Sequence, residues 1–165
     1  MSYLFKLKEI NTFVFDVDGV FTNNTILCGE GGEMLRNMNV IDGLAIKKAL
    51  EKKYTIVIIT GGGDLGVKKR LQYLGVQHIF DKTFEKAECL LKFSKENKID
   101  LSNVLYIGDD LPDLKAMEIC GLKCCPKNAV TQVKKIADYI SPKNGGEGIV
   151  REMIEKVMKI QGTWD

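Results

Sequence analysis

Two aspartates separated by one residue follow a short apolar run near the start of the chain. The run Phe13-Val14-Phe15 leads into Asp16, and Asp18 follows just before Gly19. A strand that ends at the carboxyl edge of a sheet delivers its next side chains into the crevice where open α/β folds bind ligands. Because the chain turns at the glycine, both carboxylates can converge on one point, where they repel unless a cation or a proton lies between them. Such oxygen ligands suit Mg²⁺ together with a phosphate.

Polar residues also follow two later apolar runs. Thr60-Gly61 offers a hydroxyl and a backbone amide that suit a phosphate oxygen. Lys86 opens a helical segment, where a lone lysine is usually a surface residue, but its place in the order of motifs favours a role at the site.

The apolar run Val104–Ile107 is followed by an acidic cluster, Asp109 and Asp110, with Asp113 three residues further on. Asp109, together with Asp16 and the carbonyl of Asp18, would complete a set of oxygen ligands for a divalent ion. Asp110 and Asp113 fit equally well as helix N-caps.

Strands and helices alternate along the chain, as in a doubly wound, mostly parallel α/β sheet. The predicted strands are Thr12–Asp16, Thr55–Thr60, His78–Phe80, Val104–Ile107, Leu122–Cys125 and Tyr139–Ile140. The predicted helices are Gly43–Lys53, Asp64–Leu74, Phe84–Asn97, Pro112–Ile119, Thr131–Ala137 and Gly148–Ile160. The exception is a β-hairpin at about 22–35, in which Thr25–Cys28 and Glu33–Leu35 flank a glycine-rich turn.

Length and composition fit one globular domain over residues 1–165, with a C-terminal tail at about 144–165. A formal net charge of only +2 gives no electrostatic case for nucleic acid. No apolar run reaches the roughly 20 residues that span a bilayer, and the N-terminus lacks a signal-peptide pattern. The five cysteines show no paired zinc spacing and are expected to be free thiols in a reducing compartment, so we expect a cytoplasmic protein.

The order of motifs, Asp-x-Asp-Gly-Val, Thr-Gly, Lys and Gly-Asp-Asp-x-x-Asp, resembles that of the haloacid dehalogenase superfamily of phosphohydrolases. The resemblance implies a Rossmann-like fold in which Asp16 is the nucleophile that forms an aspartyl-phosphate and Asp18 is the general acid and base. It also implies that Thr60 and Lys86 hold the phosphate, and that Mg²⁺ is bound by Asp16, Asp18 and Asp109. These roles agree with the chemistry, because Asp16 must stay ionised to attack.

The intervals between the motifs leave room for the hairpin but not for a cap domain. Together with this, Phe15-Asp16-Val17-Asp18-Gly19-Val20-Phe21-Thr22, Met38-Asn39-Val40-Ile41-Asp42-Gly43, Arg70 and Gly145-Gly146-Glu147-Gly148-Ile149-Val150-Arg151-Glu152 resemble the capless family of 3-deoxy-D-manno-octulosonate 8-phosphate phosphatases. That family makes a sugar acid used in lipopolysaccharide and assembles as a homotetramer around its hairpins. The resemblance implies a substrate site lined by Asp18, Asn39, Val40, Ile41, Asp42, Gly43, Lys47, Gly61, Arg70, Lys86 and Arg151, with Asp110 and Asp113 in support.

The tail has two interpretations. Its glycine-rich stretch gives the backbone freedom to fold across a site and bring Arg151 to it. Alternatively, the tail helix packs on its own subunit.

The sequence departs from the pattern of this family at two places, and these departures leave the identity of the substrate undecided. Gly62 stands where the family commonly has an arginine, and Asp81-Lys82 stands where it has Gln-Gly. A related phosphatase acting on the nine-carbon 2-keto-3-deoxynononate 9-phosphate shares the scaffold, and another small phosphate ester or a phosphoprotein is a further alternative. Non-enzymatic alternatives are a receiver-like phospho-switch, against which the order of motifs argues, and an oligomerisation module.

Overall fold

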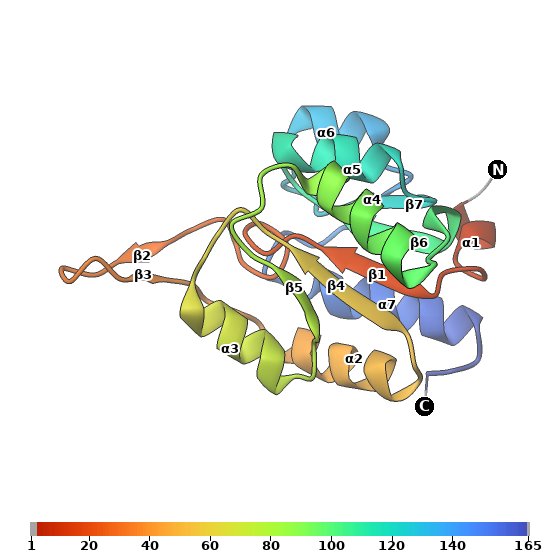
Figure 1. Ribbon diagram of the computed structural model, residues 1–165, viewed down its shortest axis with the longest axis horizontal. Helices are drawn as coiled ribbons and strands as arrows, with labels where there is room; N and C mark the ends of the chain where they lie inside the picture. Colours follow the sequence, from red (N-terminus) through yellow and green to blue (C-terminus); the bar gives the residue numbers. More distant parts are fainter. Residues whose placement is uncertain (1–2, 165) are drawn as a thin grey trace.

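The computed structural model describes residues 3–164, which form a six-stranded sheet with helices on both faces and a separate hairpin (Figure 1). The sheet strands are β1 (Thr12–Phe15), β4 (Thr55–Ile59), β5 (His78–Phe80), β6 (Val104–Ile107), β7 (Leu122–Cys125) and β8 (Tyr139–Ile140). They are all parallel and lie in the order β5-β4-β1-β6-β7-β8. The chain builds outwards from β1 in both directions, so the end of β1 is the switch point where such sheets bind ligands. The doubly wound, mostly parallel sheet predicted from the sequence is confirmed.

The two faces of the sheet are covered by different helices (Figure 1). One face carries α2 (Val40–Glu51), α3 (Leu65–Tyr73) and α7 (Ile149–Ile160), and the other carries α4 (Lys86–Asn97), α5 (Leu114–Glu118) and α6 (Thr131–Ile136). The short α1 (Tyr3–Lys6) and two 3-10 helices, Leu101–Asn103 and Leu111–Asp113, complete the described elements. Because side chains alternate along a strand, Phe13 and Phe15 enter one core and Val14 enters the other. Buried on both faces, β1 holds the residue after it in a fixed position.

The predicted hairpin consists of β2 (Leu27–Cys28) and β3 (Met34–Leu35), which pair in antiparallel fashion. It extends away from the body of the molecule (Figure 1). Leu27 is 69% exposed and Leu35 is 55% exposed, so the hairpin has apolar side chains on its surface.

The helices differ from the predicted ones by one to three residues at most of their ends, and two of the differences have a clear local reason. α2 begins at Val40 rather than Gly43, because the side chain of Asn39 accepts a hydrogen bond from the backbone N–H of Ile41 and caps the helix earlier. The helix predicted at 112–119 is divided in two. Asp110 caps the 3-10 helix Leu111–Asp113, and α5 follows it.

The C-terminal helix α7 belongs to the core of its own chain. Met153, Ile154 and Val157 of α7 are fully buried on the α2 side of the sheet. The glycine-rich stretch before it also contacts the body, since the N–H of Gly146 donates to the carbonyl of Val20. The tail helix therefore packs on its own subunit, as in the second of the two interpretations given above. A contribution of the glycine-rich stretch to a site stays a prediction.

All five cysteines lie within the described part of the chain and are free, as expected. Among residues 3–164, no helix is both long enough and apolar enough to cross a bilayer.

Candidate active site

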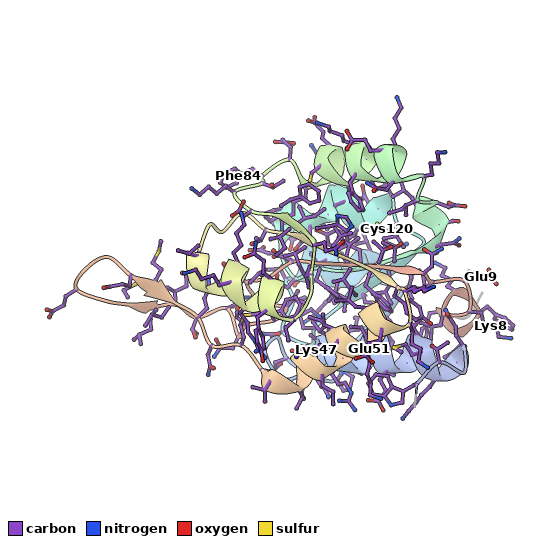
Figure 2. All side chains as sticks on the ribbon, turned by 60° about the horizontal axis from the view of Figure 1, so that its bottom comes forward. Lys8, Glu9, Lys47, Glu51, Phe84 and Cys120 are labelled. Atoms are coloured by element: carbon purple, nitrogen blue, oxygen red, sulfur yellow. The ribbon has the colours of Figure 1, made fainter. Side chains whose placement is uncertain are left out.

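The carboxyl ends of β1, β4 and β6 surround a cavity of about 250 Å³. Its lining includes the residues predicted to carry the chemistry, together with several neighbours: Asp16, Asp18, Asn24, Thr60, Gly61, Gly62, Thr83, Phe84, Lys86, Asp109, Asp110 and Pro112. All four sequence motifs thus meet at one edge of the sheet. Phe84 is 76% exposed and forms part of the rim on the loop before α4, where it points outward (Figure 2).

Lys86 is the centre of a buried ion-pair network. Its Nζ lies 2.9 Å from Oδ1 of Asp16 and 2.8 Å from Oδ1 of Asp113. The hydroxyl of Tyr106 on β6 also donates to Oδ1 of Asp113, and the backbone N–H of Asp109 donates to Oδ2 of Asp113. Asp113 is completely buried, so its bonds hold Lys86 in place from behind the cavity.

Asp109 approaches Asp16 across the cavity. Carboxylate oxygens of Asp16, Asp109 and Asp113 lie within 4.8 Å of one another. Oδ2 of Asp109 accepts a hydrogen bond from Asn24, whereas Oδ1 is buried and has no hydrogen-bond partner among residues 3–164. An unpartnered buried carboxylate oxygen beside a second carboxylate fits a divalent cation with oxygen ligands.

Gly19 is required by this close packing. It has a φ of +86°, and a Cβ at this position would lie 2.0 Å from Oδ2 of Asp109. Any larger residue would displace Asp109 from the site.

Asp18 is engaged by an arginine from the base of the hairpin. Nε of Arg36 donates to Oδ1 of Asp18 over 2.7 Å, and a terminal nitrogen donates to Oδ2 over 3.0 Å. The side chain of Arg36 is only 7% exposed. The pair is bidentate, which is the strongest arrangement between a guanidinium and a carboxylate.

Burial raises the pKa of Asp16 to about 7, and the negative charge of Asp113 adds to this rise, whereas Lys86 acts against it. Burial likewise raises the pKa of Asp109 to about 6, with Asn24 opposing the shift. For Lys86, burial favours the neutral amine, but Asp113 and Asp16 together outweigh it and raise its pKa. A cation between Asp16 and Asp109 would favour the ionised form of both carboxyls, as a nucleophilic carboxylate requires.

Most residues that the resemblance assigned to the substrate lie outside this cavity in the single chain. Asn39 and Val40 line a second, larger cavity of about 600 Å³, together with Asn23, Asn128 and the stretch Asn144–Glu147. Asp42 is buried, and its Oδ1 accepts the backbone N–H of Arg151. Ile41 packs beside Gly148, where a Cβ would meet its Cδ1 at 2.6 Å.

The three other cations assigned to the substrate also lie elsewhere. Lys47 and Arg70 both lie over the ring of Tyr73, and a nitrogen of Arg70 closely approaches Gly43. Figure 2 shows Lys47 on α2, on a different part of the surface from Phe84 at the cavity rim. Arg151 pairs with Glu155 and lies over the ring of Trp164.

Three contacts at the site were not predicted. The contact of Tyr106 could have been predicted, since a hydroxyl within an apolar strand needs a hydrogen-bond partner. Asn24 and Arg36 could not have been found from the sequence, because their positions depend on the path of the chain into and out of the hairpin.

Comparison with known proteins agrees with the fold and with the resemblance seen in the sequence. The model of the haloacid dehalogenase-like hydrolase family matches residues 72–153. The 3-deoxy-D-manno-octulosonate 8-phosphate phosphatase of Escherichia coli K12 is 34% identical over 160 residues, which cover 97% of this chain and 85% of that protein.

Solved structures give the same result. The Moraxella catarrhalis phosphatase of that name, in complex with magnesium ion, phosphate ion and KDO, superposes with a TM-score of 0.93 and 36% identity, covering 96% of this chain and 91% of that one. The cobalt-bound Haemophilus influenzae phosphatase has a TM-score of 0.91 and 30% identity, covering 95% and 92%.

The sheet, the switch-point aspartates and the buried lysine define a phosphohydrolase of the haloacid dehalogenase class. Within this class, the chain belongs to the family of 3-deoxy-D-manno-octulosonate 8-phosphate phosphatases.

Proposed function

We propose that the protein hydrolyses 3-deoxy-D-manno-octulosonate 8-phosphate to the free sugar acid and inorganic phosphate, in the supply of a lipopolysaccharide precursor. The observation that carries the proposal is the buried network in which Lys86 bridges Asp16 and Asp113 beside the open oxygen of Asp109. Family membership supports the substrate, because the relatives bear this name and one of them binds KDO and phosphate together.

In this proposal the chain's own residues divide the chemistry. A carboxylate oxygen of Asp16 attacks phosphorus, and the bond from phosphorus to the sugar oxygen breaks. Thr60 and Lys86 hold the phosphoryl oxygens, and Asp18 gives a proton to the leaving alcohol. Asp18 then takes a proton from the water that releases phosphate from Asp16.

Asp16 and Asp109, with the carbonyl of Asp18, are the groups that would hold Mg²⁺. When bound, the ion neutralises the phosphoryl charge and favours ionised Asp16. The orphan oxygen of Asp109 supports this assignment.

The test is a comparison of kcat/KM for purified protein with Mg²⁺ on the eight-carbon substrate, on 2-keto-3-deoxynononate 9-phosphate and on p-nitrophenyl phosphate. We expect the eight-carbon substrate to have the highest value. A higher value for the nine-carbon substrate would indicate that the protein is a 2-keto-3-deoxynononate 9-phosphate phosphatase. Equal values for all three substrates would indicate a phosphatase without sugar specificity.

We further propose that the protein is a cytoplasmic homotetramer built around the hairpins. Its free cysteines support a reducing compartment, and exposed Leu27 and Leu35 support a contact between hairpins. Replacing both leucines by lysine should reduce the mass measured by light scattering to that of a monomer or dimer. Leu91→Lys, at a similarly exposed position on α4, is the matched control and should leave the mass unchanged.

A further inference from the structure

Arg36 occupies both oxygens of the carboxylate proposed to protonate the leaving group. Its Nε and one terminal nitrogen bind Oδ1 and Oδ2 of Asp18 at 2.7 and 3.0 Å. The other terminal nitrogen donates to the carbonyl of Met34 and lies 3.7 Å from Oδ2 of Asp64. In this arrangement each oxygen of Asp18 accepts one bond from the arginine. A proton placed on either oxygen would break one of these bonds, so release of the arginine favours the protonated acid that the leaving group needs.

A group that replaces Asp18 on the arginine should itself be a carboxylate. The edge of a guanidinium formed by Nε and one terminal nitrogen is a planar fork of N–H donors that matches one carboxylate at a time, and in Arg36 this edge holds Asp18. Leaving the buried guanidinium with no anion on that fork would carry a desolvation cost. Exchange of one carboxylate for another avoids this cost and frees Asp18 in the same event.

Arg36 can lie beside Asp18 because residue 62 is glycine. A Cβ at position 62 would lie 3.6 Å from the terminal nitrogen of Arg36 and 3.6 Å from Oδ2 of Asp18. A long side chain at position 62 would therefore compete with the guanidinium for this place. The glycine leaves the place to an arginine that arrives from the hairpin, 26 residues earlier in the chain.

The other cations near the cavity are already committed. Lys86 pairs with Asp16 and Asp113. Lys68 and Arg36 line a separate small cavity, which shares Asp18, Thr60 and Gly62 with the catalytic cavity, and Lys68 pairs with Asp81. Arg36 is thus the cation in direct contact with the proposed proton donor.

We propose that Arg36 is a specificity-determining residue that binds the carboxylate of the sugar acid, and that this binding releases Asp18 to act on the leaving oxygen. The proposal rests on the proposed function. In this proposal Arg36 recognises a leaving group that carries a carboxylate. A phosphate ester without a carboxylate cannot displace Asp18 from Arg36, so Asp18 is still held by the arginine when such an ester reacts.

The test is the effect of Arg36→Met on two substrates. For 3-deoxy-D-manno-octulosonate 8-phosphate, kcat/KM should fall by at least about tenfold, as expected for loss of a charge-assisted bidentate contact. For p-nitrophenyl phosphate, which has no carboxylate, kcat/KM should stay the same or rise, because Asp18 is no longer held. Lys68→Met, which removes a cation from the same cavity without touching Asp18, should leave the ratio of the two values unchanged.

Two further variants separate recognition from structure. Adding Gly62→Arg to Arg36→Met should restore part of the preference for the sugar acid, since residue 62 faces the vacated space. Arg36→Lys, which keeps the charge but not the fork, should fold as the wild type does by thermal melting and should lose part of the preference.

Equal losses on both substrates in Arg36→Met and Arg36→Lys, or a ratio unchanged from wild type, would overturn the role of Arg36. The proposed function fails separately: it is overturned if the wild-type enzyme itself shows no preference for the sugar acid phosphate over p-nitrophenyl phosphate.

Discussion

Nζ of Lys86 donates to Oδ1 of Asp113 over 2.8 Å, in a part of the protein where Lys86 is 4% exposed and Asp113 is completely buried. This contact fixes the lysine so that its remaining donors face Asp16 and, in the proposed mechanism, the incoming phosphate. A lysine on a flexible stem would otherwise have to be ordered at each encounter with substrate, at a cost in conformational entropy.

Replacing Asp113 by Asn should therefore reduce both stability and turnover. Removing one partner of a buried ion pair costs about 3–5 kcal/mol in the free energy of unfolding. Tyr106→Phe removes only the hydroxyl that donates to the same carboxylate, so it should cost about 1 kcal/mol and leave kcat within a fewfold of wild type. Urea unfolding and steady-state kinetics measure both quantities. A kcat in Asp113→Asn equal to that in Tyr106→Phe would show that the charge of Asp113 does not position Lys86.

Asp109 should determine the affinity for the metal ion. Asp109→Asn keeps an oxygen that can accept from Asn24 but removes the charge, so we expect the Mg²⁺ concentration for half-maximal activity to rise by about 10–100-fold. EDTA should abolish wild-type activity and Mg²⁺ should restore it. The control is Asp110→Asn, which keeps an oxygen able to cap the helix at Leu111 and should change the requirement far less. Calorimetric Mg²⁺ binding of equal affinity in Asp109→Asn and wild type would exclude Asp109 as a ligand.

Asp42 should make the protein less stable as the pH rises. Burial raises its pKa from 3.8 to about 6, only partly opposed by the N–H of Arg151, and its Oδ2 has no partner within residues 3–164. Because the native state then binds more protons than the unfolded state between about pH 4 and pH 6, stability falls as the pH increases through this interval. One pKa unit is worth about 1.4 kcal/mol, so the total loss above pH 6 is about 3 kcal/mol.

The measurement is the free energy of unfolding of wild type and Asp42→Asn at several pH values between 4 and 8. Asn cannot ionise and can still accept the N–H of Arg151, so the variant should lack this part of the decline. The difference between the two curves should grow with pH. A constant difference would show that Asp42 does not titrate in this range.

Much of the fold and the core of the site could be predicted, because both depend on local patterns. Apolar runs of strand length gave the order of elements, and the rule that parallel strands share a carboxyl edge placed Asp16 near Asp109. The buried position of Lys86 followed from the order of motifs rather than from its own surroundings in the sequence, which favoured a surface lysine.

The rest depends on contacts between segments that the sequence pattern does not encode. The contact of Arg36 with Asp18 requires the chain to return from the hairpin directly above the end of β1. The resemblance assigned Asp42 to the substrate site, and in the single chain its Oδ1 accepts the backbone N–H of Arg151 in the first turn of α7. Arg151 is likewise directed to Glu155 and Trp164, because helix α7 is anchored by its apolar face.

The central claim is that Asp16 becomes phosphorylated during hydrolysis of the sugar acid phosphate. The variant Asp16→Asn has nearly the same shape but no anionic nucleophile, so it should fold as the wild type does and release no phosphate. Glu96→Gln, an equivalent change on the exposed surface of α4, should keep full activity.

The most direct measurement is mass spectrometry of the Asp18→Asn enzyme, quenched in acid during turnover of 3-deoxy-D-manno-octulosonate 8-phosphate with Mg²⁺. Asp18 acts in both steps, so this variant slows formation as well as hydrolysis of the acyl phosphate, and a series of quench times captures the intermediate before it is hydrolysed. We predict a phosphoryl group on the peptide that contains Asp16, and none when Asp16 is also replaced by Asn. Continued release of phosphate with Asp16 unmodified, or with the phosphoryl group on another residue, would contradict the account.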